Sequence, residues 1–325
     1  MRFFRTISFE EFLRVKGETE ALEWYREVPF HNYGYSKLLS LFHQYCLVGG
    51  IPEVAEAWAV KRDTGLFAPI YEKHLTTLFS EASDLGSTEK TSDRLLQIYQ
   101  DSFPFAATRI TFRGFSNPVF RSREVSAAFR QLQDRGLLRL IYPTTSTSLP
   151  WQIDFGRSPR IQLPDTGLVN YFTGIQEVLA GKEDLSEVFN RQISLHIVAQ
   201  ELFFTGGQAD RGTGGQADRR TGGQAVHFWV REKTQSSAEV DFVIEYNNMM
   251  IPIEVKRGEP GRLRSLHQFV DAAPHPFAVR LYAGPLMVRE TRTVTGRTYY
   301  MMSLPYFLAG KIREHLEGFI KFVNW

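Results

Sequence analysis

The chain has 325 residues, of which 43% are apolar and 23% charged, and its 38 basic and 36 acidic side chains leave a formal net charge of +2. This composition is that of a globular protein with room for two domains, and it excludes a polycation, so any affinity for nucleic acid must come from a local basic patch. The single cysteine, Cys46, excludes an internal disulfide and favours a cytoplasmic setting, while the absence of a long apolar run predicts no membrane partner.

Residues 1–86 are predicted to be mainly helical. Ser8 stands two residues before Glu10-Glu11, and Phe12 and Leu13 then begin an apolar stripe, which is typical of a helix start. Residues 35–47 carry a second apolar stripe, and Gly49-Gly50 with Pro52 ends that helix and begins another. These residues indicate a helical first region.

Residues 87–158 have the pattern of a winged helix-turn-helix. We expect one helix over 91–102, a second from Ser122 to Gly136, and a β-wing made by strands at 137–142 and 151–155. Between residues 105 and 140, seven arginines stand against two acids. Arg121, Arg123 and Arg130 are therefore predicted to contact DNA phosphates, with a solvated face or a protein-docking role as the alternatives.

Residues 159–325 are predicted to form an α/β domain. A short strand at 161–163 precedes Asp165, which is expected to cap a helix and not to bind a metal. In the helix predicted over 184–204, Glu201 lies on the apolar stripe of Ile193, Ile197 and Val198 by its i+4 and i+3 spacing. A carboxylate on an inward face needs a partner, unless it lies at the edge of the stripe and reaches water.

The sequence Thr-Gly-Gly-Gln-Ala recurs at 205, 213 and 221 with a period of eight residues. It contains little to bury, so residues 205–225 are predicted to be a flexible insertion. These glycines lack the Gly-x4-Gly-Lys-Ser/Thr pattern of a phosphate-binding loop, and we expect no ATP site in this chain.

Residues 239–256 alternate in the manner of two strands around Asn247-Asn248, which predicts a β-hairpin with a tight turn. With these two residues as the turn, Asp241 lies opposite Glu254, and Glu239 lies opposite Lys256. Opposed carboxylates destabilise a sheet, and a divalent cation between them is the simplest reason for that register. A solvated face with alternating charges is the alternative. The last residues, 263–325, are expected to add a helix, a strand at 278–282 and a closing strand and helix.

Glu201 on a helix, Asp241 on one strand and Glu254-Val255-Lys256 on the next resemble the active-site skeleton of the restriction-endonuclease-like fold, the PD-(D/E)xK nucleases. The run "VDFVIEYNNMMIPIEVKRG", followed by "RLRSLHQF", is similar to the C-terminal domain, of unknown function and numbered 4143, of a group of prokaryotic AAA-type ATPases. Further similar stretches are "SFEEFL", "YCLVGGIPE" and "LPDTGLVNYF".

The resemblance implies a metal-dependent nuclease domain in which Glu201, Asp241 and Glu254 bind Mg²⁺ or Mn²⁺ and Lys256 assists the attacking water. Val240 replaces the proline of the nominal motif. Because this chain lacks the phosphate-binding loop of the ATPase core, we expect no ATP hydrolysis by it alone and expect a separate ATPase as a partner. The alternative is a non-catalytic module that binds DNA or protein.

Overall fold

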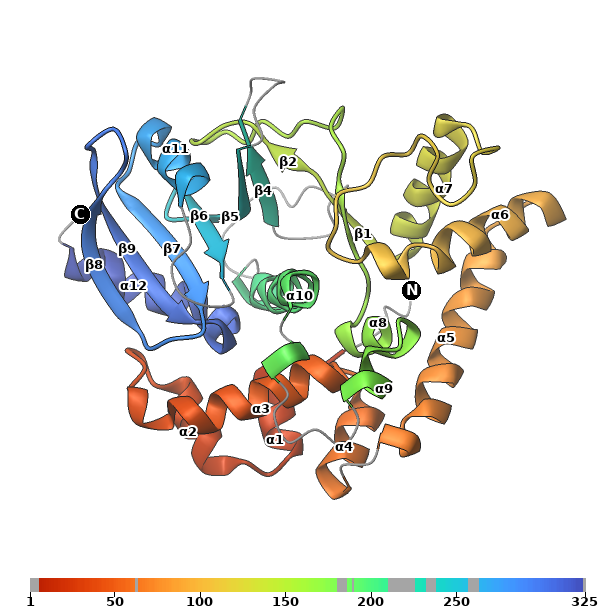
Figure 1. Cartoon of the computed structure of the whole chain (residues 1–325), viewed down its shortest axis with the longest axis horizontal. Helices are drawn as coiled ribbons and strands as arrows, with labels where there is room; N and C mark the ends of the chain where they lie inside the picture. Colours follow the sequence, from red (N-terminus) through yellow and green to blue (C-terminus); the bar gives the residue numbers. More distant parts are fainter. Residues whose placement is uncertain are drawn as a thin grey trace. The chain divides into compact units, whose positions relative to one another are not determined.

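A computed structural model of the chain describes residues 6–61, 64–179, 186–188, 190–209, 226–231, 238–256 and 263–323 (Figure 1). It is a mixed α+β protein, which confirms that part of the predicted fold class. None of the described helices is both long and apolar enough to cross a membrane.

By compactness the chain divides into two units that interleave along the sequence. The first comprises residues 1–18, 40–140 and 158–200, and the second comprises residues 19–39, 141–157 and 201–325. Two helices, α3 (Tyr35–Val48) and α10 (Arg191–Ala209), have residues in both units.

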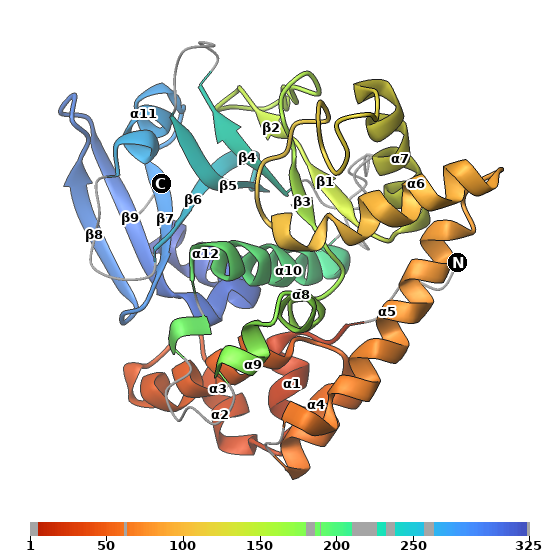
Figure 2. The ribbon, with the colours of Figure 1, turned by 45° about the vertical axis from the view of Figure 1, so that its right-hand side comes forward.

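The first unit is built mainly from helices. Ser8 caps α1 with a reciprocal hydrogen-bond pair to Glu11, as its sequence predicts. Helices α5, α6 and α7 pack in succession (Figure 2). The described helices that lie wholly within this unit are α1 (Phe9–Val15), α4 (Pro52–Val60), η2 (Thr64–Leu66), α5 (Ala68–Ser83), α6 (Glu89–Gln100), η3 (Phe103–Phe105), α7 (Ser122–Arg135), α8 (Thr166–Phe172), α9 (Ile175–Leu179) and η4 (Ser186–Val188).

The two helices predicted in this region are present as α6 and α7, but the strands predicted to follow them pair differently. Gly136 ends α7 in the left-handed conformation, as its sequence suggests. However, β1 (Arg139–Ile141) pairs with β3 (Arg160–Gln162), and β2 (Pro143–Thr144) joins β4 (Val226–Val230) in another sheet. Residues 151–155 keep a short local pairing: Ile153 forms an antiparallel bridge with Thr144, flanked by hydrogen bonds from the Thr145 N–H to Gln152 and from the Asp154 N–H to Pro143. The local hairpin is therefore shorter than predicted and begins at residue 143, while the strand before it pairs over a longer range.

The second unit is organised around a seven-stranded sheet with the order β2-β4-β5-β6-β7-β9-β8. Strands β4, β5 and β6 form an antiparallel meander, and β6, β7 and β9 run parallel to one another. The remaining elements of the unit are α2 (Thr19–Arg26), η1 (Asn32–Gly34), β5 (Glu239–Tyr246), β6 (Met249–Val255), α11 (Arg264–Ala272), β7 (Phe277–Tyr282), β8 (Met287–Arg292), β9 (Thr298–Pro305), η5 (Tyr306–Lys311) and α12 (Ile312–Phe322).

The predicted hairpin register is confirmed from the turn as far as the pair Phe242 and Ile253. Asn247 and Asn248 form the turn with φ of 48° and 59°, a conformation that asparagine tolerates. Beyond that pair β5 departs from a regular strand: between the pairs His227–Val243 and Trp229–Val240, β4 advances two residues and β5 three. This is a β-bulge, and Asp241 lies in it.

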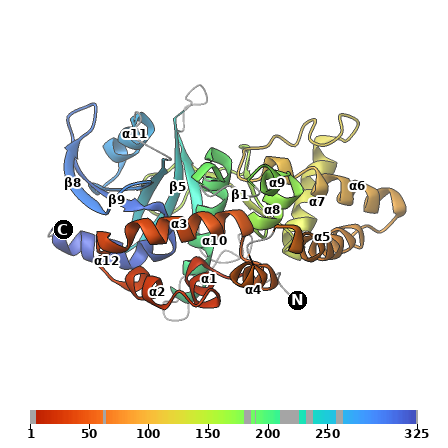
Figure 3. The ribbon, with the colours of Figure 1, turned by 60° about the horizontal axis from the view of Figure 1, so that its bottom comes forward.

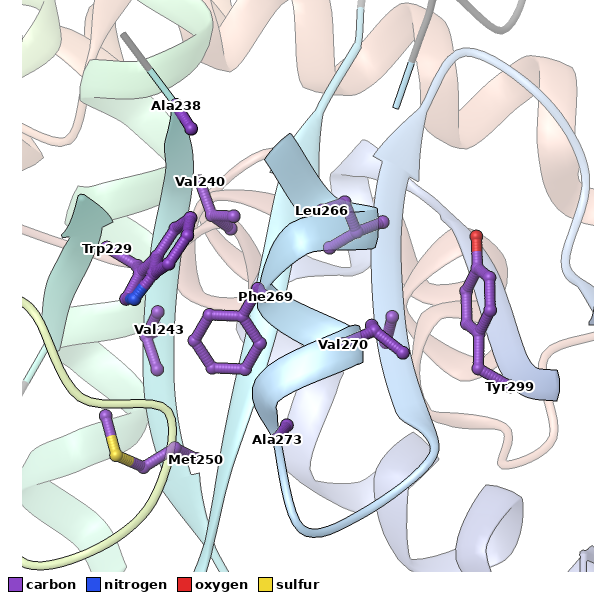
Figure 4. Close-up of a cluster of buried hydrophobic side chains, with 11 residues drawn as sticks. Trp229, Ala238, Val240, Val243, Met250, Leu266, Phe269, Val270, Ala273 and Tyr299 are labelled. Carbon is purple, nitrogen blue, oxygen red and sulfur yellow. The ribbon is translucent and has the colours of Figure 1, made fainter. Parts of the chain in front are cut away.

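The two faces of the sheet are covered by different helices (Figure 3). Val240, Val243, Phe269 and Ala278 belong to one buried apolar cluster between the sheet and α11 (Figure 4). Phe277 points the other way and meets Phe319 of α12 with ring centroids 5.3 Å apart. Because alternate residues of a strand point to opposite faces, these two helices fix the side to which each polar residue of the sheet turns.

The repeat insertion predicted at 205–225 lies mostly outside the described residues. Helix α10 continues five residues beyond the predicted end at 204, to Ala209. Strand β4 then begins at Val226, directly after the predicted end of the insertion.

Candidate active site

Asp241 is the most constrained of the predicted site residues. Its side chain is 1% exposed, and its Oδ2 atom accepts a hydrogen bond of 2.8 Å from the backbone N–H of Val255. That N–H belongs to the residue between Glu254 and Lys256. The bulge in β5 therefore directs the Asp241 side chain toward the end of β6. The structure thus brings Asp241 to the Glu-x-Lys segment.

Glu254 and Lys256 form an ion pair, with Oε1 and Nζ 2.6 Å apart. Glu254 is the second-last residue of β6 and pairs with Arg280 of β7. Lys256 follows the strand, and its N–H donates to the carbonyl of Leu281. The predicted pairing of Glu239 with Lys256 does not occur, because the ladder between β5 and β6 ends at the pair Phe242 and Ile253. On the other edge of β5, Glu239 pairs with Val230 of β4. The bulge at Asp241 is the physical reason, since it shifts the register of β5.

Glu201 points inward, as its spacing predicts, and is 1% exposed. A Cβ atom on Gly310 would lie 2.6 Å from its Oε2 atom and 2.8 Å from the Tyr25 hydroxyl, so the carboxylate lies against η5 and beside that tyrosine. Lys311 Nζ lies 5.8 Å from the centroid of the Tyr25 ring. Sequence reasoning did not anticipate these neighbours, because η5 and α2 are more than a hundred residues away from Glu201 in the chain.

The donors available for a metal ion are the two strand carboxylates. Mg²⁺ is commonly held in proteins by one or two carboxylates together with water and substrate phosphate, and Asp241 and Glu254 fit that donor set. Within the described ranges, no three His, Cys, Asp or Glu side chains gather closely enough to hold a metal ion. The role of Glu201 as a third ligand therefore stays a prediction.

Arg280 is a buried charged residue that the sequence prediction passed over. It is 8% exposed and lies directly beside Glu254 in the parallel ladder of β6 and β7. The signal for it is an arginine inside the apolar run Phe277–Tyr282, which was predicted only as a strand. A charge at such a position needs a physical reason.

Asp165 in the first unit is a buried carboxylate of another kind. As predicted, it caps α8 by accepting from the N–H of Leu168, and it also accepts from the N–H of Gly50 at 2.6 Å. Burial raises the pKa of Asp165 to about 6, although these hydrogen bonds act to lower it. Its partners are three backbone N–H groups and the side chain of Gln200, and its role is structural.

A chain of buried hydrogen bonds continues from the same helix. His196 accepts from the N–H of Leu163 and contacts the Thr166 hydroxyl at 2.8 Å, and that hydroxyl donates to Gln200. Burial lowers the pKa of His196 to about 3, so the ring is neutral at physiological pH. A neutral, hydrogen-bonded histidine of this kind supports the packing of the first unit.

The three arginines predicted to contact DNA are exposed. Arg121 precedes α7, and Arg123 and Arg130 lie on it, the last bonded to the Ser126 hydroxyl at 3.0 Å. Beside them, a cavity of about 440 Å³ is lined by residues of α6 and α7, including Arg94, Arg123 and Glu124. Arg94 and Glu124 form an ion pair of 2.8 Å and neutralise each other. The positive charge beside this cavity is therefore that of the three exposed arginines.

Comparison with known families places the two strand carboxylates within a recognised domain. Residues 215–305 match a domain of unknown function, DUF4143, which confirms the predicted similarity to that domain over this range. Residues 39–179, which include two of the other stretches taken with it, match a second domain of unknown function, DUF8612. No curated protein and no solved structure matches the chain.

Proposed function

We propose that the end of the β5–β6 hairpin is the active site of a metal-dependent phosphodiesterase that acts on nucleic acid. The observation that carries the proposal is the hydrogen bond between Asp241 and the backbone of Val255. It joins a buried carboxylate to a Glu-x-Lys segment on the adjacent strand. A solvated hairpin face would not need a bulge that buries one of its acids.

The order of the elements supports a relation to restriction-endonuclease-like nucleases. Glu201 lies on α10, Asp241 on β5 and Glu254 on β6, in the sequence that the resemblance implies. Strands β5 and β6 are neighbours in the sheet, so two of the three carboxylates come from adjacent strands.

Asp241 and Glu254 would hold Mg²⁺ or Mn²⁺, which when bound supplies a Lewis acid for the phosphodiester and lowers the pKa of water. The hydrogen bond from Val255 fixes the orientation of Asp241, and this preorganises one carboxylate. The ammonium of Lys256 now neutralises Glu254 and is placed to orient an attacking water or to stabilise charge on phosphate.

The test is cleavage of plasmid DNA in Mg²⁺ or Mn²⁺. Asp241→Asn keeps an acceptor for the Val255 N–H but removes the charge, and we expect it to lower the cleavage rate about 100-fold or more. Glu290→Ala, which removes an exposed acid from β8, is the matched control and should cleave like the parent. Equal rates in the parent and Asp241→Asn would contradict the proposal.

A second candidate function, DNA binding without hydrolysis, is favoured by the exposed arginines at α7. It predicts duplex binding that weakens steeply with salt and is lost in the triple variant Arg121→Ala, Arg123→Ala, Arg130→Ala, with no hydrolysis in any metal. Binding by the triple variant equal to that of the parent would exclude this surface.

The resemblance of residues 215–305 also leads us to propose that a separate AAA-type ATPase works with this chain. The purified chain alone should release no phosphate from ATP. Co-elution with an ATPase core encoded next to this gene would support the partnership, and separate elution of the two proteins would contradict it.

A further inference from the structure

Arg280 is 8% exposed, and its side chain has no anionic partner in the described part of the chain. Its Nε atom has no hydrogen-bond acceptor, and no carboxylate in the described part of the chain forms an ion pair with it. Its neighbour Glu254 is engaged by Lys256 instead. Removing most of a cation from water without a counter-ion is costly, so the position of Arg280 needs a reason other than packing.

Arg280 is held in place by the face of Tyr282. The Cζ atom of the arginine lies 4.3 Å from the centroid of that ring. The Tyr282 hydroxyl donates to the carbonyl of Pro285, and a Cβ atom on Gly284 would lie 2.3 Å from the ring, so a side chain at that position would displace it. A cation–π contact offsets only part of the cost of burying a charge, but it orients the guanidinium.

Arg280 belongs to a row of polar residues that runs across the sheet, perpendicular to the strands. Glu254 of β6, Arg280 of β7 and Ser303 of β9 are successive partners across the parallel strands. By strand alternation they lie on the face that Ala278 presents to α11. Lys256 lies at the end of the same row, bonded through its N–H to the residue after Arg280. Two cations therefore accompany one carboxylate in this row.

We propose that Arg280 binds a non-bridging phosphate oxygen of the phosphodiester substrate next to Glu254 and Lys256. This inference rests on the proposed function for the identity of the substrate. The planar fork of a guanidinium matches the oxygens of a phosphate, and an arginine beside the reacting group stabilises the charge that develops in phosphoryl transfer. In the free protein the same charge is a stability cost, which the phosphate removes.

The experiment compares the thermal unfolding of the full-length parent with that of Arg280→Met and Arg280→Lys. It is done in EDTA, with and without inorganic phosphate, against sodium chloride of equal ionic strength. Arg289→Met, which removes an exposed arginine from β8, is the matched control. Working without metal ions and without cleavage separates this inference from the proposed function.

We expect phosphate to raise the unfolding midpoint of the parent and of Arg289→Met by about 2 °C. It should raise that of Arg280→Met by less than half as much, and Arg280→Lys should lie between, because lysine keeps the charge but not the fork. Without phosphate, Arg280→Met should unfold at a higher temperature than the parent.

The shift of the unfolding midpoint caused by phosphate tests whether Arg280 binds it. Equal responses in the parent and Arg280→Met, or no response in the parent, would overturn the assignment. If Arg280→Met does not fold, the response of Arg280→Lys takes its place. An anion site confirmed here together with no metal-dependent cleavage would leave Arg280 as a phosphate ligand and remove the nuclease proposal.

Discussion

Each unit of this protein buries a charged group, and the two groups differ in their partners. Asp165, in the first unit, accepts hydrogen bonds from two backbone N–H groups, one at the start of α8 and one at Gly50. The side chain of Arg280, in the second unit, lies against an aromatic ring and has no hydrogen bond or ion pair among the described residues.

The contrast separates a structural charge from a functional one. When backbone donors surround a buried carboxylate, they hold chain segments together, and nothing outside the protein is needed. When a buried guanidinium lacks an anion, the protein bears a cost that selection for stability alone would remove. We therefore interpret Asp165 as part of the fold and Arg280 as part of a site.

The largest effect is expected where the chain passes closest to the Asp165 segment. A Cβ atom on Gly167 would lie 2.0 Å from the carbonyl oxygen of Val48, so Gly167→Ala should lower the free energy of unfolding by about 3 to 5 kcal/mol. Gly318→Ala, where no atom lies within 4 Å of the added methyl group, is the control and should be neutral or stabilising. Urea unfolding measures both, and equal effects would show that the two segments are not tightly packed.

The charge of Asp165 itself should appear in the pH dependence of stability. Because its pKa in the folded protein is raised to about 6 from an ordinary 3.8, the folded state binds the proton more tightly, and this stabilisation is lost as pH rises from about 4 to about 6. Relative to Asp165→Asn, the parent should lose about 3 kcal/mol over that window. A constant difference between the two proteins across the window would show that the carboxylate stays ionised in the folded protein.

The contact between Arg280 and Tyr282 should be measurable as a coupling energy. Tyr282→Leu removes the aromatic face and Arg280→Met removes the charge, and in a double-mutant cycle the two should couple by about 1 to 2 kcal/mol. If the two substitutions change the free energy of unfolding additively, the ring does not hold the guanidinium. The contrast between Arg280 and Asp165 would then depend only on the burial of the two residues.

The smallest effect is expected at the turn of the hairpin that carries the site. Asn248 has a φ of 59°, so Asn248→Ala should lower the free energy of unfolding by about 1 kcal/mol, whereas Asn248→Gly should not lower it. Unfolding in denaturant distinguishes the two variants. A similar loss in both would indicate that the asparagine side chain contributes more than its backbone conformation.

Local features of the fold could be predicted from the sequence. The turn at Asn247-Asn248, the hairpin register up to Phe242, the cap at Asp165 and the inward direction of Glu201 depend on residues within a few positions of one another. Periodicity and turn chemistry contain that information.

Features that depend on distant strands could not be predicted in this way. The bulge at Asp241 is visible only against β4, and the pairing of β2 with β4 joins residues more than eighty positions apart. The place of Arg280 beside Glu254 likewise follows from the parallel pairing of β6 and β7. A single sequence shows that an arginine interrupts an apolar strand, but not which neighbours it meets.

The most direct test of the central claim, that Asp241 and Glu254 together bind a divalent cation, is a calorimetric titration of Mn²⁺ into the parent and into Asp241→Asn. The variant keeps the acceptor for the Val255 N–H, so a loss of binding reports on the charge and not on the fold. We predict a saturable binding heat in the parent that is absent in the variant. No binding in the parent, or equal binding in both proteins, would contradict the claim.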